Sequence, residues 1–144
     1  MTVFCDTSVL AASCVRRHPH YARAWPVLVD VRARRMTGIM GAHSVAEVYS
    51  ALTTMPVEPR ILPSEAAAIL NRNVIPFFHV QPATTDLYRR AVANCARHAL
   101  PGGKVYDALL IECARDANCD RIYTFNQRDF ERLTPDYPGL VMAP

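Results

Sequence analysis

Short apolar runs alternate along the chain with longer segments in which apolar residues recur every three or four positions. The runs are rich in β-branched and aromatic residues, as buried strands are, and they lie at residues 2–5, 35–40, 77–80, 121–125 and 139–143. The longer segments have the spacing of helices with one buried face, and they lie at residues 6–14, 18–34, 42–55, 64–73, 85–100 and 105–119. Residues 126–133 form a loop or a short helix. This alternation predicts an α/β fold, with a mainly parallel sheet of about four or five strands flanked by helices.

The ends of these helices carry recognisable signals. Thr7 or Ser8 is expected to cap the first helix, and Thr84 or Thr85 the fifth. Pro26 lies inside the second helix, where a proline removes a backbone hydrogen bond, and it predicts a kink or an early break. The chain contains no repeat, low-complexity segment or linker. All 144 residues are therefore predicted to form a single domain.

The composition is that of a folded protein, and we expect it to be cytoplasmic. Hydrophobic residues make up 51% of the chain and charged residues 20%, which favours a packed core over disorder. The five cysteines lack a C-x-x-C pair, so we interpret them as reduced thiols. No signal peptide is visible, and no stretch approaches the roughly 18 apolar residues of a membrane span. The net charge of +3 is compatible with a polyanionic partner but does not establish one.

The ligands of an open α/β sheet bind outside the carboxyl ends of the strands, and two of four candidate acids fall at that edge. Asp6 ends the first strand, and Asp129 follows the strand at residues 121–125. A third, Glu47, lies on the helix at residues 42–55. Asp107 lies in the first turn of its helix, and its helical neighbours Leu110, Ile111 and Ala114 offer it no polar partner. Such an aspartate is rarely buried unless another group pairs with it.

Each acid also has an ordinary structural explanation. Asp6 and Asp129 could be turn or capping residues, Asp107 could interact with the helix dipole, and Glu47 could pair with His43 one turn earlier. Converging carboxylates, however, would repel one another, and a divalent cation removes that repulsion. Sites made only of oxygen ligands suit Mg²⁺ or Mn²⁺. We therefore interpret Asp107 as the partner of a metal ion.

Two other enzyme classes begin with an aspartate at the end of the first strand. Phosphatases of the haloacid dehalogenase type require D-x-D, but the third position here is Ser8. Phosphoacceptor receiver domains need an acidic pair at the first strand and an aspartate ending the third, and the chain does not show both. Neither class fits the pattern.

Four segments in order resemble the PIN domain family over essentially the whole chain. The stretch VFCDTSVLAA resembles the opening strand of that family, and AHSVAEVYS resembles the helix that bears its glutamate. VYDALLIECA resembles the segment with the third acid, and IYTFNQRDF resembles the closing T-x-N-x-x-D-F motif. The chain length is similar to that of the VapC toxins of type II toxin–antitoxin pairs, which are stand-alone PIN domains.

The resemblance implies a Mg²⁺-dependent endoribonuclease toxin, with Mn²⁺ as a possible substitute, that cleaves RNA phosphodiester bonds with a metal-activated water. The residues that match its catalytic and metal-binding acids are Asp6, Glu47, Asp107 and Asp129. The residues expected to hold the acids or the substrate are Thr7, Thr124, Asn126 and Lys104. Because Asn126 stands where some relatives carry aspartate, we expect a second metal ion to bind weakly or not at all.

The resemblance also implies partners: an RNA substrate, a cognate antitoxin that blocks the acidic site, and a second copy of the chain in a homodimer. Apolar residues of the first two helices are candidates for the antitoxin groove, namely Leu10, Val15, Trp25, Leu28 and Val29. Two alternatives stay open: a PIN fold that binds without catalysis, and a metal-dependent DNA nuclease. All four acids are present, which favours an enzyme over a silent binding module.

Overall fold

The computed structural model describes residues 1–144 and contains a five-stranded sheet in the order β3-β2-β1-β4-β5. Every strand pairs in parallel with its neighbours. The strands are β1 (Thr2–Cys5), β2 (Thr37–Gly41), β3 (Phe78–Gln81), β4 (Arg121–Tyr123) and β5 (Val141–Met142). The α-helices are α1 (Thr7–Cys14), α2 (Tyr21–Arg32), α3 (Ala42–Thr54), α4 (Pro63–Ile69), α5 (Thr85–Arg97), α6 (Lys104–Asp116) and α7 (Gln127–Leu133). A π turn (Leu70–Val74) and a 3-10 turn (Ile75–Phe77) connect α4 to β3. The α/β prediction is confirmed.

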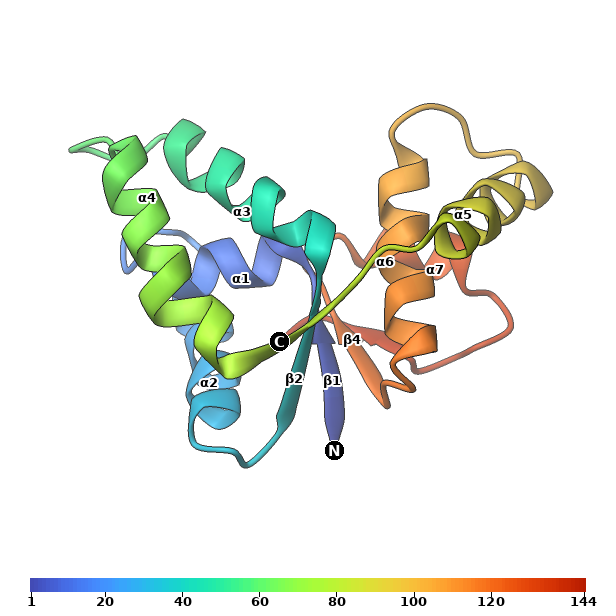
Figure 1. Ribbon diagram of the computed structural model, residues 1–144, viewed down its shortest axis with the longest axis horizontal. Coiled ribbons are helices and arrows are strands. Elements are labelled where there is room, and N and C mark those ends of the chain that lie inside the picture. The colour runs from blue at the N-terminus through green and yellow to red at the C-terminus, as the bar shows by residue number, and fades with distance from the viewer.

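The helices form two layers, one on each face of the sheet. Figure 1 shows α1 to α4 on one side of the strands and α5 to α7 on the other. Val3 and Met40 face the first layer and belong to one core cluster, whereas Phe4 and Ile39 belong to a second cluster with α5, α6 and α7. Because successive residues of a strand point to opposite faces, both faces are apolar. This explains why the strands read as continuous apolar runs.

The strand order places a crevice beside β1. The chain moves from β1 outward to β2 and β3, and then crosses the sheet to β4 on the other side of β1. Ligands of open parallel sheets bind at such a reversal of direction, at the carboxyl ends of the strands. The Asp6 N–H donates to the Tyr123 carbonyl at 3.0 Å, so β1 and β4 end at the same level. This edge is where the predicted acids meet.

Glycine is required at one point in β2. A Cβ atom added at Gly38 would lie 2.6 Å from Val31 Cγ1 and 2.8 Å from the Phe78 ring, distances that exclude any larger residue without movement of the core. The glycine therefore lets β2 pass close to α2 and its neighbour β3.

Two predicted helix features differ in the structure. The Thr84 hydroxyl caps α5 by accepting from the Leu87 N–H at 3.3 Å, as expected, but neither Thr7 nor Ser8 caps α1. The helix begins at Thr7, with Asp6 at the N-cap position and no side-chain cap. Thr7 and Ser8 are thus the first two residues of the helix, and their hydroxyls donate to the carboxylates of Glu47 and Asp6. Pro26 is accommodated within α2, which stays continuous.

None of the helices combines the length and hydropathy that crossing a bilayer requires. The five cysteines are free thiols. Burial raises the pKa of the Cys113 thiol to about 11 and that of Cys119 to about 12. These thiols therefore stay protonated and pack as apolar groups.

Candidate active site

Asp6 is fixed at the end of β1 by two hydroxyl groups. Ser8 Oγ and Thr124 Oγ1 each donate to Asp6 Oδ2 at 2.7 Å. Thr124 in turn accepts from the Asn126 N–H at 2.9 Å, which ties the segment after β4 to the end of β1. The carboxylate is 6% exposed. Because both bonds go to Oδ2, Oδ1 is engaged by neither hydroxyl and remains available to a ligand.

Glu47 approaches the same edge from α3. Thr7 Oγ1 donates to Glu47 Oε2 at 2.8 Å, and His43 Nε2 lies 3.7 Å from Glu47 Oε1. The His43 ring stacks in parallel on the Tyr106 ring, with centroids 5.3 Å apart. The stacked pair connects α3 to α6 next to Glu47 and Asp107.

Asp107 and Asp129 lie at the start of α6 and α7 and have different neighbours. The Lys104 ammonium forms an ion pair with the Asp129 carboxylate, and this hydrogen bond, followed by one from Asn126, lowers the Asp129 pKa. The Asp107 carboxylate accepts only a long bond of 3.4 Å from Asn126 Nδ2. Burial, followed by the charge of Asp6, raises the Asp107 pKa from 3.8 to about 6. Lys104 opposes that rise, while Asp129 and Glu47 add to it.

The four acids therefore share one electrostatic environment, which we call the acidic site: Asp6, Glu47, Asp107 and Asp129. The four polar residues predicted to support them also lie there and contact them: Thr7, Thr124, Asn126 and Lys104. The carboxylates do not converge on one point, however, since no group of three His, Cys, Asp or Glu side chains is close enough to hold a metal ion. Glu47 and Asp129 are instead held by Thr7 and Lys104.

The donor chemistry of the acidic site fits a hard divalent cation. Its candidate ligands are carboxylate oxygens, which Mg²⁺ and Mn²⁺ prefer, and Asp107 faces like charges without a cation bonded to it. A cation would remove the repulsion that raises the Asp107 pKa.

Ser8, His43 and Tyr106 were not among the predicted site residues. Ser8 joins Asp6 to the chain after β4, because its hydroxyl also accepts the Phe125 N–H at 3.1 Å. The D-x-S spacing after a buried strand was a visible signal, since serine two residues after aspartate often bonds to it. The stacking of His43 on Tyr106 joins two helices far apart in the sequence, so no local pattern could have revealed it.

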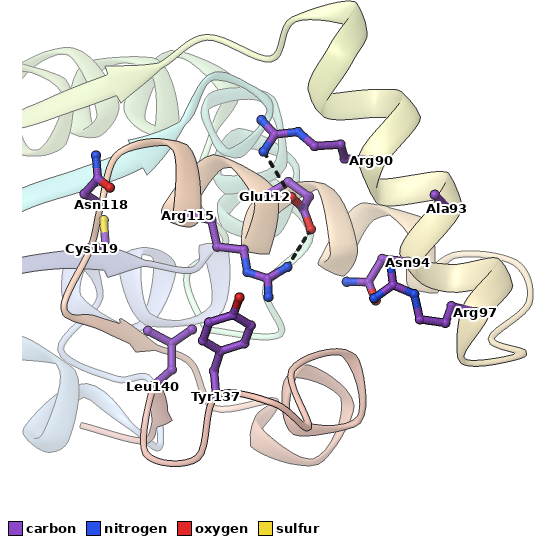
Figure 2. Close-up of a pocket in the computed structure, with 10 residues that line it drawn as sticks. All are labelled: Arg90, Ala93, Asn94, Arg97, Glu112, Arg115, Asn118, Cys119, Tyr137 and Leu140. Atoms are coloured by element: carbon purple, nitrogen blue, oxygen red, sulfur yellow. Dashed lines mark hydrogen bonds and ion pairs between the residues drawn. The ribbon is translucent and has the colours of Figure 1, made fainter.

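A cavity of about 660 Å³ lies at the other end of α6 and contains none of the four acids. Figure 2 shows the Glu112 carboxylate there between the guanidinium groups of Arg90 and Arg115. Glu112 is 4% exposed, although at about 100° per residue it falls on the same side of the helix as Arg115 and Asp116. The two arginines satisfy this buried carboxylate, so we interpret it as structural.

Comparison with known proteins agrees with this geometry. The family model of the PIN domain matches residues 3–134. The chain belongs to the PIN domain family. Within it, Ribonuclease VapC27 of Mycobacterium tuberculosis is 33% identical over 111 residues, which are 77% of this chain and 75% of that protein. Ribonuclease VapC40 of the same species is 33% identical over 105 residues, 73% of this chain and 72% of that protein. This PIN domain is therefore a member of the VapC ribonuclease toxins.

Solved PIN-fold structures superpose on most of the chain. VapC20 of Mycobacterium tuberculosis, a sarcin-ricin loop cleaving toxin, has a TM-score of 0.71 and 18% identity over 88% of this chain and 92% of its own. VapBC2 from Rickettsia felis, bound to a DNA fragment from its promoter, has a TM-score of 0.65 and 15% identity over 100% and 99% of the two chains. FitAcB from Neisseria gonorrhoeae has a TM-score of 0.66 and 14% identity over 91% and 92%. At these identities the structures show a shared fold.

Proposed function

We propose that this PIN domain is a Mg²⁺-dependent endoribonuclease that acts as the toxin of a toxin–antitoxin pair. The observation that carries the proposal is Asp107, a half-buried carboxylate surrounded by other carboxylates and bonded to no cation. A half-buried carboxylate among like charges destabilises the folded state. Carboxyls with such a perturbed pKa are frequent in active-site crevices. The curated relatives named ribonucleases supply the reaction class.

In this proposal Asp6 and Asp107 are the main cation ligands, and Glu47 and Asp129 complete the set. A bound Mg²⁺, or Mn²⁺ in its place, supplies Lewis acidity toward the phosphoryl oxygens and acidifies a water. The chain's own contribution is orientation. Ser8 and Thr124 hold Asp6 through Oδ2, and Thr7 holds Glu47 through Oε2.

Lys104 has a second part in the proposal. Its ammonium group lies against Asp129 and supplies positive charge at an otherwise acidic edge. A phosphate that approaches the acids would meet this charge first, and phosphate contacts of this kind supply most of the affinity for RNA. Lys104 is thus proposed to bind the substrate backbone without choosing its sequence.

Of the five residues predicted for the antitoxin groove, Trp25 is exposed and Val29 is partly exposed. Leu10, Val15 and Leu28 are buried in the core, because α1 and α2 pack against each other and against the sheet. Exposed apolar surface exists beside them, in a groove of about 960 Å³ lined by Val15, Arg17, Ile61 and Leu62 among others. We propose this groove as the antitoxin contact.

The antitoxin is tested by co-expression with the neighbouring open reading frame. Co-purification of the two chains, with loss of binding in Leu62→Glu, supports the groove, whereas recovery of this chain alone argues against the partner. A homodimer is a separate prediction, and light scattering of the purified chain checks it by giving twice the mass of 16.1 kDa.

The decisive experiment is cleavage of total RNA by purified protein with Mg²⁺ or Mn²⁺, beside an Asp107→Asn variant. Asp116→Asn is the matched control, because it makes the same change at an exposed position of the same helix. Cleavage that requires the cation, survives in Asp116→Asn and disappears in Asp107→Asn supports the nuclease. Cleavage that persists in Asp107→Asn contradicts it. DNA of the same sequence, tested in parallel, separates a ribonuclease from a DNA nuclease.

A further inference from the structure

Another cavity, separate from the two described above, adjoins the acidic site on the side of α1 and α3. It has a volume of about 360 Å³. Its walls come from α1, from the loop before α2, from the end of α3 and from the residue after Thr124, and the lining residues are Ser8, Ala11, His18, His20, Ala51, Thr54, Met55, Pro56 and Phe125. No carboxylate lines it, in contrast to the edge that it adjoins.

Aromatic rings form one wall of this cavity. The His20 ring stacks on the Phe125 ring, with centroids 4.3 Å apart and planes inclined by 18°, and the His18 ring lies 5.7 Å from His20. The guanidinium carbon of Arg23 lies 5.3 Å from the centre of the Phe125 ring. Flat rings next to a positive charge are the surfaces on which unstacked bases of single-stranded nucleic acids bind.

The histidines are not part of the core. His20 is exposed, and its backbone N–H donates to His18 Nδ1 at 3.0 Å. This bond orients the His18 ring and leaves His18 Nε2 free to bond with a ligand. Phe125 packs against the small cluster of Val9, Ala12 and Ala24. That packing explains the position of Phe125. It does not explain why the exposed His20 ring stacks on the Phe125 ring.

One serine joins the aromatic wall to the acids. Ser8 lines the cavity, donates to Asp6 Oδ2 at 2.7 Å and accepts from the Phe125 N–H at 3.1 Å. A group bound in the cavity is therefore separated from the Asp6 carboxylate by a single side chain. A base is attached to its phosphate through one sugar, so a base held here would leave a neighbouring phosphate at the acids.

We propose that this cavity binds one unstacked nucleobase of the RNA, next to the phosphate that is cut at the acidic site. The inference rests on the proposed ribonuclease function and adds a source of substrate selection to it. The apolar walls of Ala11, Ala51 and Met55 exclude water, and the face of the His20 ring turned away from Phe125 stacks on the base. His18 Nε2 donates to the edge of the base, and the Thr54 hydroxyl, which donates to the Ser50 carbonyl, accepts from it. Sites that bind small ligands combine these features.

Binding can be measured without catalysis. The full chain, free of divalent cations, is titrated with the four nucleoside 5′-monophosphates while the ring protons of its histidines are followed by NMR. We expect saturable shifts of His18 and His20, with His79 and His98 unaffected as internal controls. Ribose 5-phosphate is the probe without a base. Equal shifts with ribose 5-phosphate, equal shifts at all histidines, or none at His18 and His20 would each overturn the proposal.

The variants separate the cavity from the acidic site. His20→Ala, at an exposed position, removes the ring that stacks on the base and should weaken nucleotide binding by about 5- to 150-fold, the range for loss of one base–aromatic stack. Phe125→Leu removes the ring that supports His20 and should weaken binding in the same direction. His79→Ala, an exposed histidine on β3, should leave it unchanged. Unaltered affinity in both cavity variants would refute the base-binding role. Because this titration does not depend on cleavage, a chain that binds bases but cuts no RNA would refute the nuclease proposal alone.

Discussion

The two ends of α6 each hold a buried or half-buried carboxylate, and they treat it in opposite ways. Glu112, near the carboxyl end, lies 3.1 Å from Arg115 Nη1 and 3.5 Å from Arg90 Nη1, so two cations of the chain balance it (Figure 2). Asp107, near the amino end, has three other acids around it and only an amide at 3.4 Å. The same helix thus contains one satisfied and one unsatisfied carboxylate.

We interpret this difference as that between a structural carboxylate and one that is free to bind the proposed cation. The buried Glu112 carboxylate is compensated by two arginines. Without them it would be an uncompensated buried charge, which strongly destabilises a protein. Where the carboxylate serves a ligand, an arginine in its place would occupy the site. The one nearby cation, Lys104, is bonded to Asp129 and leaves Asp107 free.

The largest effect should come from Asp107→Asn, which removes charge at the unsatisfied end. We expect RNA cleavage to fall by at least about 1,000-fold, because in the proposed function the variant lacks a ligand of the cation while its neighbours stay in place. Stability should not fall with it, since the repulsion is relieved. After discounting for exposure, the gain is about 1 kcal/mol, or about 2–4 °C in Tm. Calorimetry and rates measured on the same preparation check both; a loss of Tm that parallels the loss of activity would contradict the comparison.

Removal of charge at the satisfied end should have the opposite pattern. Glu112→Gln leaves Arg90 and Arg115 without their shared partner, and we expect a loss of about 2–4 kcal/mol in the free energy of unfolding. Urea denaturation measures it. Cleavage per folded molecule should stay unchanged, because Glu112 pairs with Arg90 and Arg115 and contacts none of the four acids. A selective loss of cleavage with normal stability would show that the two ends are not independent.

A change of pH should have a smaller effect, and it concerns the Asp107 end of α6. Asp107 has a raised pKa of about 6 in the folded chain, against 3.8 ordinarily, so the folded state binds this proton more tightly than the unfolded state. The resulting stability is fully present below pH 3.8 and is lost as pH rises to about 6. Cation affinity should correspondingly fall about tenfold per pH unit below 6. Calorimetric Mg²⁺ titrations between pH 5 and about 7.5 check this, and a pH-independent affinity would contradict it.

The smallest expected effect concerns Lys104→Met. Lys104 lowers the Asp107 pKa and, through its hydrogen bond, that of Asp129, so both should rise in the variant. The Asp107 pKa should then exceed its value of about 6. Carboxyl carbon chemical shifts followed by NMR measure both groups. Unchanged values would mean that Lys104 does not interact with the acids in solution.

The sequence was sufficient to predict most of the fold and to identify the acids that lie near one another at the sheet edge. Apolar runs such as residues 2–5 and 121–125 predicted strands because parallel strands are buried on both faces. Asp6 and Asp129 could be placed at one edge because they follow neighbouring parallel strands. These inferences needed only local pattern and topology.

The partners of the charged groups could not be predicted in the same way. Helical spacing groups Glu112 with the polar residues Arg115 and Asp116. Its burial against Arg90 of α5 depends on the packing of two helices, which that spacing does not reveal. Thr7 and Ser8 looked like helix caps, because the carboxylate that Thr7 bonds lies 40 residues away. Likewise, Leu10 and Val15 could equally have been groove or core residues until α2 was placed against α1.

The bond between Thr124 and Asp6 spans 118 residues, and it has a consequence for how the protein is made. A chain still in synthesis presents Asp6 early, but it lacks the hydroxyl that fixes this carboxylate and the segment that carries Asp129. The acidic site can therefore assemble only after β4 has left the ribosome and paired with β1. The nascent chain thus presents Asp6 without its fixing hydroxyl and without Asp129 until β4 and α7 have also been translated.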